Sequence, residues 1–144
     1  MSGVEVQVEL VEVSTEPLDV GTVHAAAAVD GAGGVCVFVG TVRDHDKGRA
    51  VSALGYSAHP SAVDQMRRVA VEVGARHEAL AVAAVHRVGD LSVGDLAVVV
   101  AVATAHRAAA FIACRELIDE LKATVPIWKH QVFSDGSDEW VGTP

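Results

Sequence analysis

Apolar residues recur along this 144-residue chain with the spacings that are typical of strands and helices. Valines alternate with polar residues over 4–8, which predicts a half-buried first strand. The continuous apolar run over 35–39 predicts a strand that is buried on both faces. Apolar runs over 80–87 and 96–104 predict two more strands, and weaker alternation over 51–56 predicts another.

Three stretches have helical patterns. An alanine-rich segment over 18–29 predicts a helix that ends at the glycines following it. A second helix is predicted from Ser61 to about His77, because Ser61 starts a sequence that resembles a capping box. The longest helix is predicted over 105–123, where apolar residues repeat every three or four positions, with Thr104 as its N-cap.

The segments between these elements complete a simple plan. Residues 40–48 read as a polar loop, and the glycines within 88–95 predict a tight connection. The polar tail over 132–144 is expected to fold back onto the body. The pattern predicts one α/β domain over residues 1–144, with mixed or antiparallel strands.

The composition and net charge of the chain limit the classes of partner that it can bind. With 51% hydrophobic and 21% charged residues, the chain can bury a real core. Its net charge of -8 argues against nucleic acid and membrane surfaces as partners. No apolar run approaches the ~20 residues of a membrane span, and the N-terminus lacks a signal pattern. Cys36 and Cys114 have no CxxC spacing, so we expect buried thiols in a reducing cytoplasm.

Two lysines flank a helix-breaking proline near the end of the chain. Pro126 cannot continue a helix, so Lys122 should lie in the last helical turn and Lys129 on the next strand or loop. A structural alternative is that Lys122 complements the helix dipole and Lys129 covers Trp128. A second cationic cluster lies upstream, and its presence favours a functional role for the two lysines.

That cluster, His106 and Arg107, falls in the predicted first turn of the longest helix. Acidic residues are favoured there, because the helix N-terminus carries a partial positive charge and unpaired N–H groups. Cations at this place favour an anion site, for which Arg supplies a planar fork. The alternative is an exposed Arg107 that points sideways.

Arg43 follows a predicted buried strand, in a loop of the kind that often carries binding groups. The neighbouring acids Asp44 and Asp46 do not predict a metal site, because adjacent residues rarely converge on one ion. His59 and His86 are interpreted as structural or surface residues.

Six motifs, in order and with matching spacing, together carry a resemblance to a known family that extends from about residue 34 to 140. The motifs are Phe-Val-Gly-Thr-Val-Arg over 38–43, Tyr56 with His59-Pro60, His-Arg-Val-Gly over 86–89, Val-Gly-Asp over 93–95, Thr-Ala-His-Arg over 104–107 and Leu-Lys-Ala-Thr-Val-Pro-Ile-Trp-Lys over 121–129. With these motifs the chain resembles the large, catalytic subunit of molybdopterin synthase.

The resemblance implies an α/β (α+β) hammerhead fold with an additional antiparallel β subdomain. It implies a homodimer at the centre of a heterotetramer, with a small ubiquitin-like sulfur-carrier subunit at each end. The carrier's Gly-Gly tail, as a thiocarboxylate, would supply two sulfurs in turn to cyclic pyranopterin monophosphate. The product is the dithiolene of molybdopterin, and neither a cofactor nor a metal is implied.

The same resemblance implies roles for individual residues. Lys122 matches the family's essential lysine and Lys129 its second active-site lysine. The residues that match the family's substrate-binding positions are Thr41, Val42, Arg43, His106, Arg107, Lys122, Lys129, His130 and Gln131.

The sequence departs from the family pattern at two positions that are expected to help bind the substrate. The family usually has an acid where this chain has Gln131, and a neutral amide cannot balance charge or accept a proton in the same way. The family often has an arginine shortly after the residue that matches Trp140, and this chain lacks it. Neither departure affects the two lysines.

Two other classes of function stay open at this point. One is a non-catalytic phosphate- or pterin-binding scaffold of the same fold. The other is a cysteine-persulfide sulfurtransferase that uses Cys36 or Cys114. Apolar surroundings raise the pKa of a thiol and make it inert, which argues against the second class.

The helix length adds a prediction about assembly. His106 and Lys122 are 16 residues apart, or about 24 Å along one helix. A pterin monophosphate is roughly half that long, and its binding groups must converge within hydrogen-bond reach. We therefore expect a two-fold dimer in which His106 and Arg107 of one chain complete the lysine site of the other.

Overall fold

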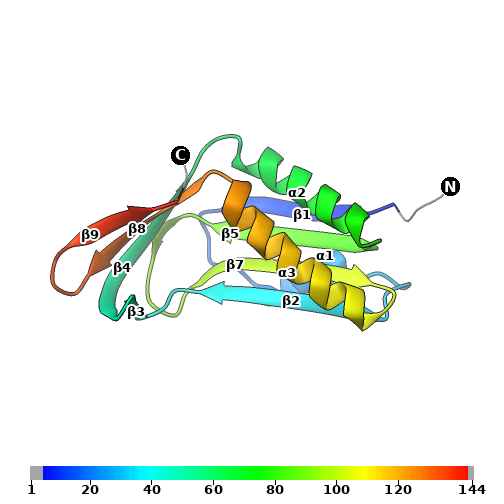
Figure 1. The fold of residues 1–144 in the computed structure, drawn as a ribbon, viewed down its shortest axis with the longest axis horizontal. Coiled ribbons are helices and arrows are strands. Elements are labelled where there is room, and N and C mark those ends of the chain that lie inside the picture. Colours follow the sequence, from blue (N-terminus) through cyan, green and yellow to red (C-terminus); the bar gives the residue numbers. More distant parts are fainter. Residues whose placement is uncertain (1–4, 143–144) are drawn as a thin grey trace.

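The computed structural model describes residues 5–142, which contain three helices and nine strands (Figure 1). None of these helices is long and apolar enough to cross a membrane. In chain order the elements are β1 (Gln7–Ser14), α1 (Val20–Ala27), β2 (Gly34–Thr41), β3 (His45–Asp46), β4 (Arg49–Ala58), α2 (Ala62–Arg76), β5 (Ala81–Arg87), β6 (Gly89–Leu91), β7 (Leu96–Thr104), α3 (Arg107–Thr124), β8 (Ile127–Phe133) and β9 (Asp138–Val141).

The larger sheet has the strand order β1-β5-β7-β2. β1 runs parallel to β5, and the other two pairs are antiparallel, so the predicted mixed sheet is confirmed. Helices α2 and α3 cover one face, and α1 covers the other (Figure 1). The first strand lies later than predicted, at Gln7–Ser14, and Val4 falls outside the described residues.

The core explains why the two central strands read as continuous apolar runs. On β7, Val98, Val100 and Val102 pack towards α2 and α3, and Val99 and Ala101 pack towards α1. Side chains alternate between the faces of a strand, so a strand covered on both faces needs apolar residues at every position. The bounds predicted for β5 and β7 agree with the structure to within one residue.

The prediction that the strand over 35–39 is buried on both faces is wrong. This strand, β2, forms an edge of the larger sheet, and its residues are mostly half-buried. Phe38 keeps 39% of its surface exposed. An apolar run does not indicate whether a strand will be central or at an edge, and the side chains of an edge strand are less completely covered.

Of the two predicted helix starts, Ser61 is confirmed as the N-cap residue of α2, whereas the N-cap predicted for α3 is wrong. Ser61 precedes α2, but its side chain makes no capping hydrogen bond, and its backbone N–H donates to His59 Nδ1 at 3.1 Å. The N-cap of α3 is His106 rather than Thr104. The Thr104 hydroxyl instead donates to the carbonyl of His106, so it stabilises the turn that leads into the helix.

The smaller sheet has the order β3-β4-β8-β9, with β6 also paired to β4, and every pair is antiparallel. It extends from one end of the larger sheet (Figure 1). The hammerhead fold with an added antiparallel subdomain is therefore confirmed. Segments predicted as loop, connection and tail contribute β3, β6 and β9, because strands this short lack a recognisable pattern of their own.

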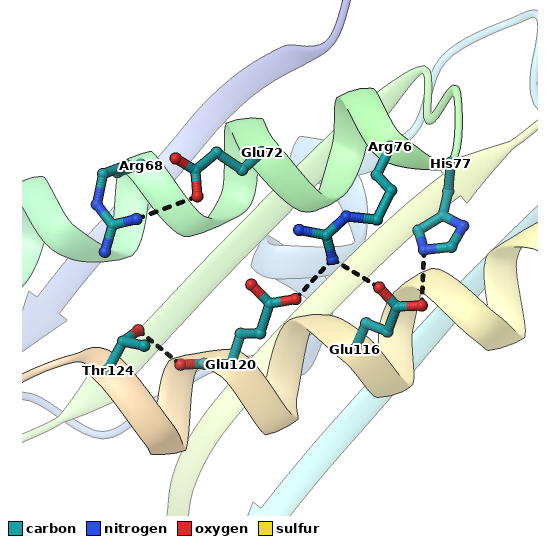
Figure 2. Close-up of polar contacts among 7 residues, drawn as sticks. All are labelled: Arg68, Glu72, Arg76, His77, Glu116, Glu120 and Thr124. Atoms are coloured by element: carbon teal, nitrogen blue, oxygen red, sulfur yellow. Dashed lines mark hydrogen bonds and ion pairs between the residues drawn. The ribbon is translucent and has the colours of Figure 1, made fainter.

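Polar contacts between α2 and α3 hold the second half of α3 in place (Figure 2). Arg76 donates to Glu116 at 2.7 Å and to Glu120 at 2.6 Å, and His77 lies beside Glu116. These side chains are partly exposed, so their main effect is on the orientation of the helix rather than on stability. The helix end that they fix carries Lys122.

Candidate active site

A pocket of about 210 Å³ opens where the C-terminal end of α3 meets the smaller sheet. Most of its wall is aliphatic, and its polar lining comes chiefly from two lysines, a tyrosine and a histidine. The lining residues are Tyr56, Met66, His86, Val98, Ile118, Leu121, Lys122, Val125, Ile127, Lys129, Val141 and Gly142. Lys122 and Lys129 thus reach one pocket from two different elements, as the sequence predicted.

The turn between the lysines explains their convergence. α3 ends at Thr124, and the N–H of Val125 closes its last turn on the carbonyl of Leu121. Pro126 stops the helix, and β8 begins at the next residue. The chain reverses within a few residues, so an amine from the last helical turn and one from the new strand face the same space.

Lys129 is half-buried, and its surroundings disfavour its charged form. Burial lowers the pKa of Lys129, and the charges of Lys122 and Arg43 lower it further. The carboxylates of Asp46 and Glu139 act in the opposite direction. An amine in such surroundings can hold an anion and can exchange a proton more readily than a surface lysine.

The sequence indicates a structural or surface role for His86, and the structure places this residue in the pocket wall. Its ring meets Tyr56 edge-on, with 4.7 Å between the ring centroids. Burial lowers the pKa of His86 to about 4, and the Lys122 charge adds to this effect. Nδ1 donates to the Arg87 carbonyl at 2.7 Å, so the neutral ring keeps Nε2 as an acceptor.

Three of the predicted binding residues lie at the end of β2. Thr41 is exposed, whereas Val42 is buried and its backbone bonds to Asp95 and Gly94 anchor the loop. Arg43 is exposed beyond this anchor, and its guanidinium donates to Asp46 at 3.2 Å. Arg43 therefore presents a cation next to Lys129, from a loop that is fixed at its base.

Gln131 and His130 lie on opposite faces of β8, because side chains alternate along a strand. Gln131 shares the face of Lys129 and is only 3% exposed. The His130 ring lies on the opposite face. There it stacks on Trp140, with 4.5 Å between the ring centroids, and its Nε2 lies 2.7 Å from an Asp138 carboxylate oxygen. Of these two predicted residues, the structure brings only the Gln131 side chain to the lysine face.

His106 and Arg107 lie at the other end of α3, about 24 Å from Lys122 by helix length. A Cβ atom at Gly34 would lie 3.2 Å from Arg107 Cα, so this helix end packs on the start of β2. Arg43 follows the other end of that eight-residue strand, roughly 26 Å away. One chain therefore does not bring the two cationic clusters together.

The first turn of α3 has the features of an anion site. His106 makes no side-chain capping bond, and no acidic residue lies in this turn. Nearby on the same helix, Phe111 is 63% exposed and Ile112 is 54% exposed. Large apolar side chains at such exposure are typical of a surface that another protein covers.

The two cysteines, distant in the sequence, lie beside each other on β2 and α3. Both are free thiols; Cys114 is buried and Cys36 is half-buried. Burial raises the pKa of the Cys114 thiol to about 12, and the neighbouring Cys36 adds to the shift. A thiol with such a pKa is almost never the reactive thiolate at neutral pH.

Comparison with known proteins agrees with the resemblance seen in the motifs. The family described as MoaE protein matches residues 13–124. Molybdopterin synthase catalytic subunit 1 of Mycobacterium tuberculosis is 44% identical over 130 residues, which is 88% of this chain and 86% of that protein. The molybdopterin synthase catalytic subunit of Bacillus subtilis is 34% identical over 135 residues, covering 93% of this chain and 85% of that protein.

Solved structures have the same fold. The crystal structure of molybdopterin synthase from Staphylococcus aureus superposes with a TM-score of 0.85 at 31% identity, covering 92% of this chain and 96% of that one. A complex of subunits 1 and 2 of molybdopterin-converting factor from Helicobacter pylori contains a chain with a TM-score of 0.67. At 18% identity, over 96% of this chain and 89% of that one, the latter shares the fold alone.

Proposed function

The chain belongs to the MoaE protein family, and we propose that the pocket holding Lys122 and Lys129 is where it transfers sulfur. It is a sulfur-transferring enzyme of molybdenum cofactor biosynthesis, as its relatives named molybdopterin synthase catalytic subunit indicate. The observation that carries the proposal for the site is the convergence of two lysines from different elements on one largely apolar pocket.

The donor in this proposal is a small ubiquitin-like carrier whose Gly-Gly tail ends in a thiocarboxylate, and the acceptor is cyclic pyranopterin monophosphate. The two-subunit complex from Helicobacter pylori supports a second subunit as partner. The sulfur arrives on the carrier, so this chain needs no reactive cysteine, in agreement with the raised pKa of the Cys114 thiol. We place the reaction in the cytoplasm, where free thiols stay reduced.

The lysines have distinct roles in this account. Lys122, at the exposed end of α3, is positioned to react with the carrier tail or to exchange protons with it. Lys129, half-buried beside Arg43, orients the reactants. In the transfer step the thiocarboxylate sulfur forms a bond to a side-chain carbon of the pterin while a bond from that carbon to oxygen breaks, and both amines stabilise the negative charge on the departing oxygen. Hydrolysis of the resulting acyl–sulfur bond leaves sulfur on the pterin and a carboxylate on the carrier.

Substrate binding in this proposal involves two copies of the chain. His106 and Arg107 lie too far from the lysine pocket of their own chain to hold the same small substrate. The exposed Phe111 and Ile112 lie on the same helix as this anion site and support an interface there. In a two-fold dimer, His106 and Arg107 of one chain would complete the pocket of the other, at the centre of a heterotetramer.

The activity is tested by reconstitution. The protein is mixed with thiocarboxylated carrier and cyclic pyranopterin monophosphate, and dithiolene formation is measured. A carrier that ends in an ordinary carboxylate is the matched control and should give no product. A complex that forms with both components but yields no dithiolene would instead support the non-catalytic scaffold.

The shared site is tested by subunit exchange. Arg107→Ala and Lys122→Ala proteins, each inactive alone, are mixed under conditions that allow dimers to exchange. Each hybrid dimer should contain one intact site, so activity should return. Proven heterodimers without activity would show that each chain builds its own site.

A further inference from the structure

Gln131 connects two carboxylates across the smaller sheet. Within residues 5–142 it is, with Thr104, one of two buried polar residues. Its Nε2 donates to Asp46 at 2.8 Å and to Glu139 at 2.9 Å. These acids come from β3 and β9, so one amide joins three strands. We call this set of residues the amide bridge.

The chemistry of a primary amide determines what the bridge does. The NH2 group of Gln131 has two hydrogens, which is one for each carboxylate. Both acids therefore accept hydrogen bonds in their ionised form, and the hydrogen bond from Gln131 is the largest cause that lowers the pKa of Asp46. The amide itself is neutral, so it fixes two negative charges in place without cancelling them.

These charges lie next to Lys129. Lys129 and Gln131 are two residues apart on β8 and share a face, and Glu139 pairs with Gln131 across the strands. Asp46 also accepts a hydrogen bond from Arg43, whose charge acts on Lys129. Within residues 5–142, no ion pair joins Lys129 to either carboxylate, whereas Gln131 donates to both and Arg43 donates to Asp46.

We propose that the amide bridge of Asp46, Gln131 and Glu139 is a positioning device that keeps Lys129 charged without binding it. The carboxylates act on the amine through space, so its hydrogens remain free for an anionic ligand. A direct salt bridge would hold the charge equally well but would occupy the donors. The importance of this device for sulfur transfer rests on the proposed function, whereas its effect on Lys129 does not.

Several charged or titratable groups surround the Lys129 amine. Lys122 and Arg43 disfavour its charged form, Asp46 and Glu139 favour it, and burial disfavours it. The groups that face it from the packed elements are Lys122 on α3, Arg43 after β2, Asp46 on β3, Tyr56 on β4, His86 on β5 and Glu139 on β9. Removal of either carboxylate should therefore lower the pH at which Lys129 loses its proton.

The sequence makes a direct measurement simple, because its only lysines are Lys47, Lys122 and Lys129. Protein labelled with ¹³C at lysine Cε gives three NMR signals, and a Lys129→Arg variant identifies one of them. The chemical shift of that signal against pH gives the titration midpoint of Lys129 in the intact protein. No carrier or substrate is needed, so the result is independent of whether sulfur transfer occurs.

Asp46→Asn and Glu139→Gln should each lower the midpoint by about half a pH unit, and the double variant by roughly twice as much. Asp46→Glu, which keeps the charge, should stay close to wild type. Asp44→Asn is the matched control, because it removes the same charge from the same loop without touching the bridge. Circular dichroism confirms that each variant is folded.

A shift in both carboxylate variants that exceeds the control supports the proposal. Midpoints within the range of Asp44→Asn, in folded protein, overturn it and leave Gln131 as a link that only ties strands together. Since the two carboxylates come from different strands, a folding defect in one variant does not remove the test that the other provides.

Discussion

Acidification should destabilise this protein through one residue of the pocket wall, His86. Folded His86 has a pKa of about 4, because burial disfavours its charged form. In the unfolded chain it returns to the ordinary value of 6.5. Between these values the unfolded state binds a proton that the folded state does not bind. Stability is therefore complete above about pH 6.5 and is lost as the pH falls towards 4.

The magnitude follows from the two values. Each pH unit between them is worth about 1.36 kcal/mol, so complete protonation of the unfolded chain costs about 3 kcal/mol. Between pH 7 and 4.5 the loss from this residue should be about 2 kcal/mol. Protonation of carboxylates with a lowered pKa, such as Asp46 and Glu116, also destabilises the folded protein in acid, mainly below about pH 4.5.

The assay compares wild type with His86→Asn. Asparagine keeps an N–H donor for the Arg87 carbonyl but does not titrate. Urea unfolding, followed by circular dichroism at fixed protein concentration, gives the free energy of unfolding at pH 7.0 and 4.5. The acidic residues are common to both proteins, so the difference between their pH dependences isolates His86.

The variant should be less stable than wild type at pH 7, because asparagine fills the site less well. Its stability should then fall by about 2 kcal/mol less than that of wild type on going to pH 4.5. Parallel losses in the two proteins would refute the reasoning, because they would mean that His86 is not held neutral in the pocket.

Three further predictions concern activity and assembly. Lys129→Ala should reduce sulfur transfer without abolishing it, because Lys129 orients rather than reacts; complete loss in folded protein would assign it the reactive role. The double variant Cys36→Ala, Cys114→Ala should keep most of its activity apart from packing losses, and an inactive but folded double variant would favour the persulfide mechanism. Phe111→Asp should convert dimers to monomers in sedimentation, whereas Val71→Asp, on exposed α2 surface, should not; equal behaviour of the two would remove Phe111 from the interface.

The sequence predicts the bounds of strands and helices well where one physical cause determines them. The central strands need apolar residues at every position, so their bounds can be read directly. Pro126 separates the elements of Lys122 and Lys129, and this separation is what the structure shows. The extent of α3 likewise follows from its apolar repeat.

The parts that could not be predicted depend on contacts between distant residues. The edge position of β2 and the pairing of β3 and β6 are decided by which strands meet, and the local pattern carries no such information. His86 lies near the end of the buried strand β5, but only the approach of α3 and β8 makes it a pocket residue. In the sequence, Gln131 is only a neutral residue at a position where the family usually has an acid. Its two carboxylate partners come from two other strands, so the local sequence does not indicate them.

The most direct test of the central claim is single-turnover sulfur transfer by Lys122→Ala. The protein is mixed with thiocarboxylated carrier and cyclic pyranopterin monophosphate, and dithiolene is quantified beside wild type. The variant should form no product above background and should melt close to wild type, since the charge at the helix end contributes at most ~1 kcal/mol. Normal turnover by the folded variant would contradict the assignment of this pocket as the active site.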